Sequence, residues 1–389
     1  MSQIDKREVW LQMYEGIVSI FRKIEDPRRG NAIDYDLIEV LIIAVLSIIC
    51  GAQYFTQMEA FGHDNIEWLK TFLVLKNGIP SHDTFGDVFA ALDPESITKA
   101  FAEWVETIRQ KISGEVVAID GKTICASKDI PKNKKATHIV SAWATQNRLV
   151  LGQLATEVKS NEITAIPKLL KLLDLKGCIV TIDAMGTQTK IAEAIIDKGA
   201  NYILTVKENQ PALRNDILFY FDSEDTSGFD TAETSDNSHG RVEYRKIVIS
   251  KDIGWLDPEG RWKNLSGIAL YITRTENLST GKIEQAVTPL IFSDANATAE
   301  QILYQKRAHW GVENSLHWRL DVAYDEDNCR VRAGNAAIVF NMLRHLSLNI
   351  LMQETTSKGG VKVKMFRCAN NKKYLEKVIG VPESKSSAN

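Results

Sequence analysis

Two aspartates stand at the ends of apolar, strand-like runs, and their type and spacing suit them to chemistry. Asp120 ends the run in EVVAIDGKTI, and Asp183 ends the run in KGCIVTIDAMG. A carboxylate at the end of a buried strand costs free energy unless it is hydrogen-bonded, ion-paired or bound to a cation. If the two strands are neighbours, both carboxylates lie at one sheet edge and can hold a pair of hard divalent cations. The structural alternatives are that Asp120 caps the turn at Gly121 and Asp183 caps the following helix.

A third acid is expected to come from a helix, and Glu313 in RAHWGVENSLHWRLD is the best candidate. Its apolar and aromatic neighbours Trp310, Val312 and Leu316 argue against an ordinary solvated helix residue. Carboxylate oxygens from two aspartates and a glutamate suit Mg²⁺ or Mn²⁺. The sequence therefore predicts a metal site formed by Asp120, Asp183 and Glu313.

Two histidines flank the third acid. His309, Glu313 and His317 follow one another at intervals of four residues, a spacing that can hold zinc on one helix face. The order differs from H-E-x-x-H, and the two strand aspartates fit magnesium better. We therefore expect the histidines to be hydrogen-bonded beside the acid or to touch phosphate.

The elements that must position these residues belong to a globular chain. It has 389 residues, of which 44% are apolar, enough for two or three packed cores. The five cysteines include no C-x-x-C pair, which indicates neither a disulfide framework nor a zinc spacing and favours the cytoplasm. The N-terminal sequence lacks a signal-peptide profile. The longest apolar run, residues 40–50, is shorter than the about 20 residues of a membrane span, so no membrane partner is expected.

The chain changes character near residue 113. Residues 1–112 predict an all-helical N-terminal domain, either a DNA-binding module or a folding unit. Residues 113–350 predict three antiparallel strands followed by alternating helices and strands, an α/β core of the ribonuclease-H kind with the aspartates on its neighbouring first and fourth strands. Residues 220–297 predict an inserted β-rich subdomain that opens with an acidic loop, DSEDTSGFDTAETSDNSHG. Residues 351–389 form a basic C-terminal tail.

Local basic patches indicate a nucleic-acid partner although the net charge is −3. Residues 358–377 carry seven Lys or Arg against one Glu, and residues 128–135 carry four Lys against one Asp. Such clusters bind phosphate through counterion release, and the alternative is an ordinary solvated face. Trp262 is expected in the core, with stacking on an unpaired base as the alternative.

Two further groups are candidates for DNA contact. Lys207, Asn209 and Gln210 in VKENQPAL follow the fifth expected strand, so they should emerge at the same sheet edge as the acids. They are expected to contact the DNA backbone or orient the site, with a turn and helix cap as the alternative. In HGRVEYRK, strand alternation places Arg241 and Arg245 on one face. Glu243 between them weakens the strand as a phosphate site.

These features together resemble the DDE transposases of bacterial insertion sequences. The shared features are an Asp on the first strand, an Asp followed by Ala on the fourth, a β-rich insertion and a Glu in an H-W-x-x-E context. The stretches DPRRG, AIDGKT, TIDAMGTQ, HGRVEYR and HWGVENSLHWRLDVAYDEDNCRVR resemble the H-repeat-associated group within that family. The resemblance covers residues from about 15 to 350.

This sequence departs from one signature of related groups. They carry Tyr, Arg, Glu and Lys around the third acid, whereas counting from Glu313 gives Lys306, His309 and Leu320 here. Tyr304 and Arg307 lie nearby in a shifted register. The resemblance therefore assigns the role of the third acid to Glu313, but it does not assign phosphate-clamp roles to the neighbouring residues.

The resemblance implies a transposase that cleaves and joins double-stranded DNA at the terminal inverted repeats of its own element. Asp120, Asp183 and Glu313 would hold two Mg²⁺ or Mn²⁺ ions, and the chain would act as a homodimer on DNA. The alternatives are a ribonuclease-H-like nuclease without strand transfer and a non-catalytic DNA-binding remnant. The presence of all three acids weighs against the remnant.

Overall fold

A large mixed sheet forms the centre of the structure. The computed structural model describes residues 6–30, 33–128, 135–156, 162–238 and 240–380. Its sheet has nine strands in the order β3-β2-β1-β4-β5-β9-β8-β7-β6. β4 is parallel to both β1 and β5, and the other neighbours are antiparallel. The strands are β1 Val116–Ile124, β2 Thr137–Ala144, β3 Leu149–Ala155, β4 Ile179–Ile182, β5 Asn201–Thr205, β6 Asp230–Ser238, β7 Arg241–Ser250, β8 Gly267–Asn277 and β9 Ile283–Phe292.

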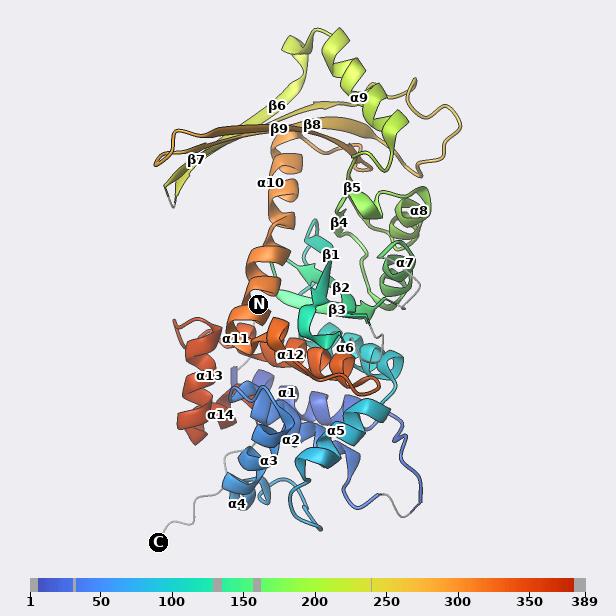
Figure 1. The fold of residues 1–389 in the computed structure, drawn as a ribbon. Helices are drawn as coiled ribbons and strands as arrows, with labels where there is room; N and C mark the ends of the chain where they lie inside the picture. Colours follow the sequence, from blue (N-terminus) through green and yellow to red (C-terminus); the bar gives the residue numbers. More distant parts are fainter. Residues whose placement is uncertain (1–5, 31–32, 129–134, 157–161, 239, 381–389) are drawn as a thin grey trace.

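The strands of the expected insertion are part of this same sheet. β9 pairs with β5 in antiparallel fashion, with Ile203 opposite Phe292. β6 to β9 therefore extend the sheet and form the long curved layer at one end of the molecule (Figure 1). The sequence predicts the antiparallel strands but not their continuity with the core, because the pairing of distant strands leaves no local signal.

β6 corrects a second expectation. The sequence predicts an acidic loop for this stretch, but Asp230–Ser238 pairs with β7 along its whole length. An edge strand keeps one side open to water, where charged side chains are tolerated and oppose unwanted pairing. Asp230 also accepts a 2.8 Å hydrogen bond from the backbone of Ala299 at the start of α10 (Ala299–His309).

Every element described between residues 6 and 108 is a helix, as the sequence predicts. The elements are α1 Lys6–Phe21, α2 Leu37–Ile49, α3 Phe55–Asp64, α4 Ile66–Leu69, α5 His82–Ala91 and α6 Pro94–Ile108. Side chains of Asp36, Ser81 and Asp93 cap α2, α5 and α6 by accepting from free backbone N–H groups. α2 is buried on nearly every face, which explains its almost continuous apolar sequence.

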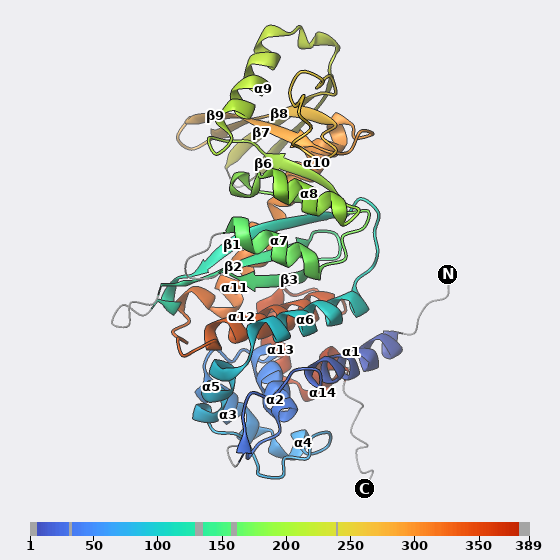
Figure 2. The same ribbon diagram turned by 90° about the vertical axis from the view of Figure 1, so that its right-hand side faces the viewer.

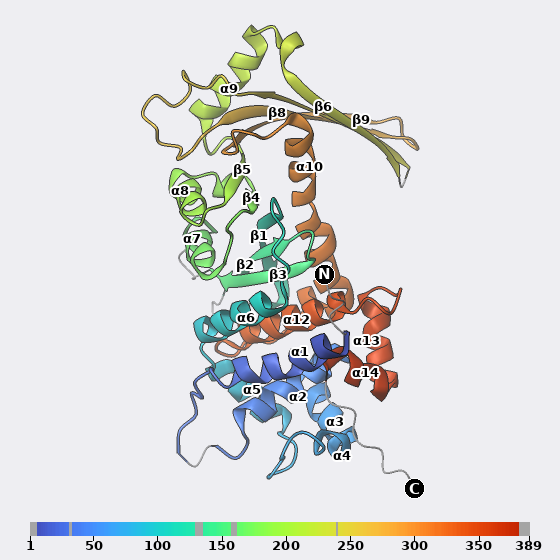
Figure 3. The ribbon, with the colours of Figure 1, turned by 180° about the vertical axis from the view of Figure 1, so that it is seen from behind.

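The later helices cover the sheet and join it to this helical layer. α7 Glu162–Leu172 and α8 Thr189–Asp197 lie on one side of the core strands, and α10 lies on the other (Figures 1 and 3). α12 Ala336–Gln353 packs against α2, α5 and α6 and also against β3 (Figure 2). The remaining helices are α9 Pro211–Ser223, α11 Trp318–Tyr324, α13 Val361–Asn370 and α14 Lys372–Ile379.

The segment after residue 351 is structured where it is described. α13 packs against α12 and α2, and α14 packs against α1. Of its basic side chains Lys364 is buried and Lys372 half-buried, whereas Lys358, Lys362, Arg367, Lys373 and Lys377 are exposed. Lys364 donates to Leu351 O, Lys377 to Thr356 Oγ1, and Arg367 and Lys372 lie over the rings of Tyr374 and Trp68. Of the other basic stretch, residues 129–134 lie outside the described residues. No described helix is long and apolar enough to span a membrane.

A candidate active site where two parallel strands separate

Asp120 and Asp183 follow directly on the paired part of two neighbouring strands. β1 and β4 run parallel from Val116 opposite Ile179 to Ile119 opposite Ile182, so the next residue of each strand is one of the aspartates. The expectation that these strands are adjacent and parallel is confirmed. Beyond this point β1 continues with β2 alone. The two carboxylates therefore emerge at the same level where β1 and β4 separate.

Glu313 lies in a π-helical turn, Val312–His317, between α10 and α11. Val312 and Leu316 are fully buried and hold this turn against the core, as the sequence predicts. Glu313 itself is exposed, and Trp310 is 56% exposed, so these two positions differ from the expected buried surroundings. The wider π turn shifts the phase of the helix, which separates side chains that an α-helix would align.

The two histidines consequently face different aspartates. His309 Nε2 lies 3.5 Å from Asp183 Oδ1, and His317 Nδ1 lies 3.6 Å from Asp120 Oδ2. They do not form one zinc face with Glu313. The sequence predicts both histidines beside Glu313 or touching phosphate, whereas the structure places each of them beside one of the aspartates.

Asp183 is held ionised by groups from α10. Buried His309 shares a 2.9 Å hydrogen bond between its Nδ1 and Thr181 Oγ1, which fixes the ring beside Asp183. A hydrogen bond from His309, aided by the positive charges of Lys306 and Lys207, lowers the pKa of Asp183 to about 2 although burial acts against this. Asp183 is therefore an anion at any ordinary pH.

Lys306 is itself an unusual cation. Its ammonium donates a 2.8 Å hydrogen bond to Thr205 Oγ1 on β5, and its side chain is buried. Burial lowers the pKa of Lys306 to about 8, while the charge of Asp183 opposes that shift. Lys306 stands at the place where related groups carry Tyr, and here it supports the aspartate.

Asp120 has the opposite electrostatics. Burial raises its pKa to about 7, and the charges of Asp183, Glu162 and Glu313 push in the same direction against a hydrogen bond from the Gly121 backbone. The neighbouring His317 supplies no charge, because burial lowers its pKa to about 4. Asp120 is thus a carboxylate without an adequate counter-charge.

These residues fit a divalent cation. A cation at Asp120 would offset the repulsion from neighbouring carboxylates, and carboxylate oxygens are the ligands that Mg²⁺ prefers. Among the described residues, however, no three His, Cys, Asp or Glu side chains gather closely enough to hold a metal by themselves. The preassembled three-acid site predicted from the sequence is therefore not formed. Mg²⁺ commonly takes only one or two carboxylates and completes its shell with water and substrate phosphate.

A cleft of 660 Å³ opens beside the acids, between α10 and the curved strands. Asp183 and Glu313 line it, together with Lys207, Lys306 and Arg245. Asp120 is not among its lining residues. The cleft brings two of the three acids together with four Lys or Arg side chains, the fourth being Arg307, an arrangement suited to a phosphate-bearing ligand.

The residues after β5 divide into two roles. Asn209 Nδ2 donates a 2.6 Å hydrogen bond to Ala184 O, and Gln210 Nε2 donates a 3.0 Å bond to Thr187 O. Both amides thus fix the loop that follows Asp183. Lys207 is exposed, lines the cleft and acts on Asp183 through its charge.

The two arginines of β7 also differ. Arg245 is ion-paired with Glu243 and with Asp236, whose Oδ2 lies 2.8 Å from its Nη1, so nearby acids neutralise it. Arg241 is exposed at the start of β7, opposite Ser238 at the end of β6. The acidic partner at Glu243 was visible in the sequence, but Asp236 was not, because it lies on the unpredicted strand β6.

Three supporting residues escaped the sequence analysis. Thr181 precedes Asp183 by two positions and so shares its face of β4. Lys122 shares the face of β1 on which Asp120 lies, and the charge of Glu162 acts on Asp120. Strand alternation could have indicated Thr181 and Lys122, whereas Glu162 reaches the site only through the fold. Trp262 is 5% exposed, which confirms the expected core position.

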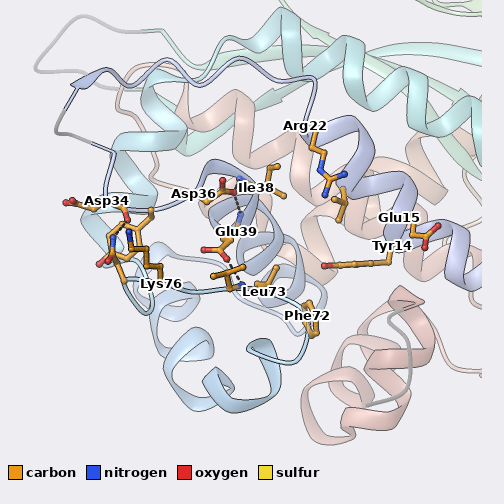
Figure 4. A pocket seen from close by; sticks show the side chains of 14 residues that line it. Tyr14, Glu15, Arg22, Asp34, Asp36, Ile38, Glu39, Phe72, Leu73 and Lys76 are labelled. Atoms are coloured by element: carbon orange, nitrogen blue, oxygen red, sulfur yellow. Dashed lines mark hydrogen bonds between the residues drawn. The ribbon is translucent and has the colours of Figure 1, made fainter. Parts of the chain in front are cut away.

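A second cleft, of 850 Å³, lies in the helical layer and is separate from the acids (Figure 4). Two of its polar side chains serve the local fold. Asp36 caps α2, and Glu39 accepts hydrogen bonds from the backbone of Val74 and Leu75. These contacts give the cleft a structural explanation.

Comparison with known proteins gives consistent matches. The family described as "Transposase DDE domain" matches residues 112–350, and the family described as "DDE_Tnp_1-associated" matches residues 18–105. "Putative transposase YncI" of Escherichia coli O157:H7 is 39% identical over 368 residues, covering 94% of each chain. "H repeat-associated putative transposase YhhI" of Escherichia coli strain K12 is 37% identical over 92% of this chain and 95% of that protein.

One solved structure, a piggyBac transposase in a synaptic complex with hairpin DNA, aligns with 98% of this chain and 84% of its own. The TM-score is 0.41 at 12% sequence identity, a similarity too low to establish a common fold.

Proposed function

The chain belongs to the DDE transposase family, in its H repeat-associated group, and on this premise we propose that it cleaves and joins DNA at the ends of an insertion sequence. The observation that carries the proposal is the pairing of β1 with β4, which brings Asp120 and Asp183 to one level beneath the turn that carries Glu313. Such an arrangement serves in-line displacement at phosphorus with two divalent cations.

We infer that β1 to β5 with α7 and α8 are a ribonuclease-H-like core. The strand order β3-β2-β1-β4-β5, with three antiparallel strands followed by two parallel ones, supports this. The neighbouring positions of β1 and β4 agree with the sequence expectation. We further propose that residues 1–112 act as a helical unit beside this core and that residues 113–350 carry the chemistry.

In this proposal Asp120, Asp183 and Glu313 are the catalytic residues and bind Mg²⁺ or Mn²⁺. When bound, the ions activate a water or a 3′-hydroxyl and stabilise the leaving oxygen. Asp183, held ionised by His309, provides an anion that needs no deprotonation. Asp120 must first lose its proton, because its pKa is raised to about 7.

The chain's basic groups hold the DNA. Lys207 and Lys306 present positive charge to a phosphate in the cleft beside Asp183 and Glu313. Arg241, exposed at the start of β7, suits a contact with the duplex backbone. Four other side chains orient the acids. Asn209 and Gln210 hold the loop after Asp183, and His309 and His317 lie beside Asp183 and Asp120. The substrate is double-stranded DNA carrying the terminal inverted repeats of the element, and since an element has two ends we expect a homodimer on DNA.

The cellular setting follows from the substrate. Bacterial chromosomes lie in the cytoplasm, and all five cysteines of the chain are free thiols, as is usual for a reducing compartment. We therefore propose a cytoplasmic location.

Two other functions compete with transposition. A nuclease of the same fold would cleave without joining, and a non-catalytic remnant would bind DNA only. Inverted repeats flanking the coding region would give the end sequence, and a duplex carrying that end should be incubated with the chain, Mg²⁺ and a supercoiled plasmid. A transposase yields 3′ ends covalently joined to the plasmid. Cleaved but unjoined ends would identify a nuclease, and bound but intact ends a remnant.

A further inference from the structure

A partly buried ion cluster surrounds a lysine of the strand that carries the first acid. Lys122 is two residues beyond Asp120 and therefore projects from the same face of β1. Its side chain is only 14% exposed. The Lys122 ammonium lies 2.9 Å from Glu326 Oε2 and 3.7 Å from Asp327 Oδ1, and it also pairs with the carboxylate of Asp321.

The carboxylates of this cluster come from the segment that follows the third acid. Asp321 lies in α11, which continues directly from the π-helical turn of Glu313. Glu326 begins the 3-10 turn after α11, and its second carboxylate oxygen accepts a hydrogen bond from Asn341 of α12. One ammonium group thus joins the Asp120 strand to the two elements that follow the Glu313 turn.

We propose that Lys122, through its ion pairs with Asp321 and Glu326, is a positioning residue that sets the separation between Asp120 and Glu313. The inference rests on the proposed function of these two acids. β1 and the Glu313 turn are almost 200 residues apart in sequence, so no local geometry fixes their spacing. A buried charge pair has a narrow range of favourable distances, because each partner loses its counter-charge when the two move apart.

The surroundings of Glu326 favour this role over metal binding. Glu326 is 1% exposed, and both of its carboxylate oxygens are engaged, one by Lys122 and the other by Asn341. If Glu313 were not the third ligand, Glu326 and Asp325 would be the next acids to consider from the sequence. Asp325 accepts a 2.7 Å hydrogen bond from Asn328. Glu326 acts here as an anchor for Lys122.

The test compares the full chain with Lys122→Met, Lys122→Arg and the control Lys263→Met. Lys263 is also ion-paired, at 2.6 Å with Asp197 and at 3.9 Å with Glu193, and both of these partners lie on α8. Amide hydrogen exchange is measured on metal-free protein without DNA. We expect exchange across residues 312–324 to become at least about tenfold faster in Lys122→Met, to recover in Lys122→Arg and to stay at the wild-type rate in Lys263→Met.

A second readout is Mn²⁺ binding by calorimetry. Loss of a supporting partner typically weakens metal affinity by about 10- to 100-fold, and we expect a weakening of this size in Lys122→Met with DNA affinity within about twofold of wild type. Wild-type exchange and wild-type Mn²⁺ affinity in Lys122→Met would overturn the inference.

If Lys122→Met does not fold, Asp321→Asn decides the question. It removes one ion pair and leaves Glu326 with its partner. We expect faster amide exchange and weaker Mn²⁺ binding in Asp321→Asn, both by smaller factors than in Lys122→Met. Unchanged exchange and unchanged Mn²⁺ affinity would again overturn the inference. Neither readout requires cleavage, so a wild-type chain that fails to cut DNA would count against the proposed function and not against the role of Lys122.

Discussion

At the residue scale, the two aspartates occupy opposite electrostatic environments although they lie at one level of the sheet. His309 and two lysines lower the pKa of Asp183, whereas burial and the charges of three other carboxylates raise the pKa of Asp120. In metal-free protein the pKa of Asp120 lies above its ordinary value of 3.8. The folded chain therefore holds an extra proton between that value and about pH 7, and its stability falls as pH rises through this window.

The same shift predicts a pH dependence of metal binding. Protons compete with the metal at Asp120 below pH 7, so Mn²⁺ affinity should fall about thirtyfold from about pH 8 to about pH 5.5. Asp183 stays ionised throughout and contributes no change. Calorimetric titrations across this range measure the affinity.

Asp120→Asn is the matched control for that titration. The amide carries no proton that titrates here, so the variant should bind Mn²⁺ more weakly and with little pH dependence. Equal pH dependence in the variant and the wild type would show that another group controls binding.

The candidate acids could be found from the sequence because each one has a local signature. Asp120 and Asp183 end apolar runs, and Glu313 lies in a recognisable motif. Their charge partners could not be found in this way. His309 meets Asp183 through the packing of α10 against the sheet, and His317 meets Asp120 after a π-helical turn that no residue pattern announced.

At the element scale, the loop after Asp183 is fixed by the segment after β5. Asn209→Ala removes the hydrogen bond to Ala184 O and leaves the DNA-facing charge intact. We expect cleavage to slow by about tenfold, the cost of about 1.4 kcal/mol for one lost hydrogen bond, while binding in a gel-shift assay stays near wild type.

Lys207→Ala should behave differently from Asn209→Ala. Lys207 lines the cleft and adds positive charge there, so its loss should weaken binding of all DNA sequences as well as cleavage. Wild-type values of both binding and cleavage in Lys207→Ala would leave only a turn-forming role for this residue.

The arginines of β7 offer a second comparison within one strand. Arg241 is exposed, whereas Arg245 is paired with Glu243 and Asp236. Arg241→Ala should lower the slope of log affinity against log salt by about 0.9, the effect of one lost phosphate contact. Arg245→Ala should leave that slope nearly unchanged. The reverse result would show that the acids release Arg245 when DNA binds.

At the whole-molecule scale, α12 joins the helical layer to the sheet. Phe340 is fully buried in α12 and packs its ring against Phe55 and Phe89 of the N-terminal helices. Phe340→Ala should destabilise the chain by about 3–5 kcal/mol. Urea unfolding followed by tryptophan fluorescence and circular dichroism measures this, and we expect both signals to change in one transition.

Phe366→Ala is the control for that measurement. Phe366 lies on α13 and is 69% exposed, so the same substitution should change stability by less than about 0.5 kcal/mol. Two separate transitions in the wild-type chain would show that the helical layer and the sheet unfold independently.

The sequence predicted the classes of elements along the chain better than their assembly. The helical start and the strand pattern after residue 113 follow from periodicity, which is local. The extension of the core sheet by β9 and the bridging position of α12 depend on contacts between distant segments. A single apolar cluster runs from Met13 in α1 to Ile379 in α14, and no stretch of sequence marks it.

Cleavage of a labelled element-end duplex measures directly whether Asp120, Asp183 and Glu313 carry out the chemistry. Each acid is changed to Ala, and Glu162→Ala serves as a matched loss of a nearby carboxylate. We expect the wild type to cleave only with Mg²⁺ or Mn²⁺. Glu162→Ala should cleave under the same conditions at a reduced rate. Each of the three acid variants should lose at least about a thousandfold in cleavage rate. The gel shift should persist in all of them and weaken with salt. Wild-type cleavage and joining by Glu313→Ala, or by either aspartate variant, would contradict the assignment of that acid as a catalytic residue.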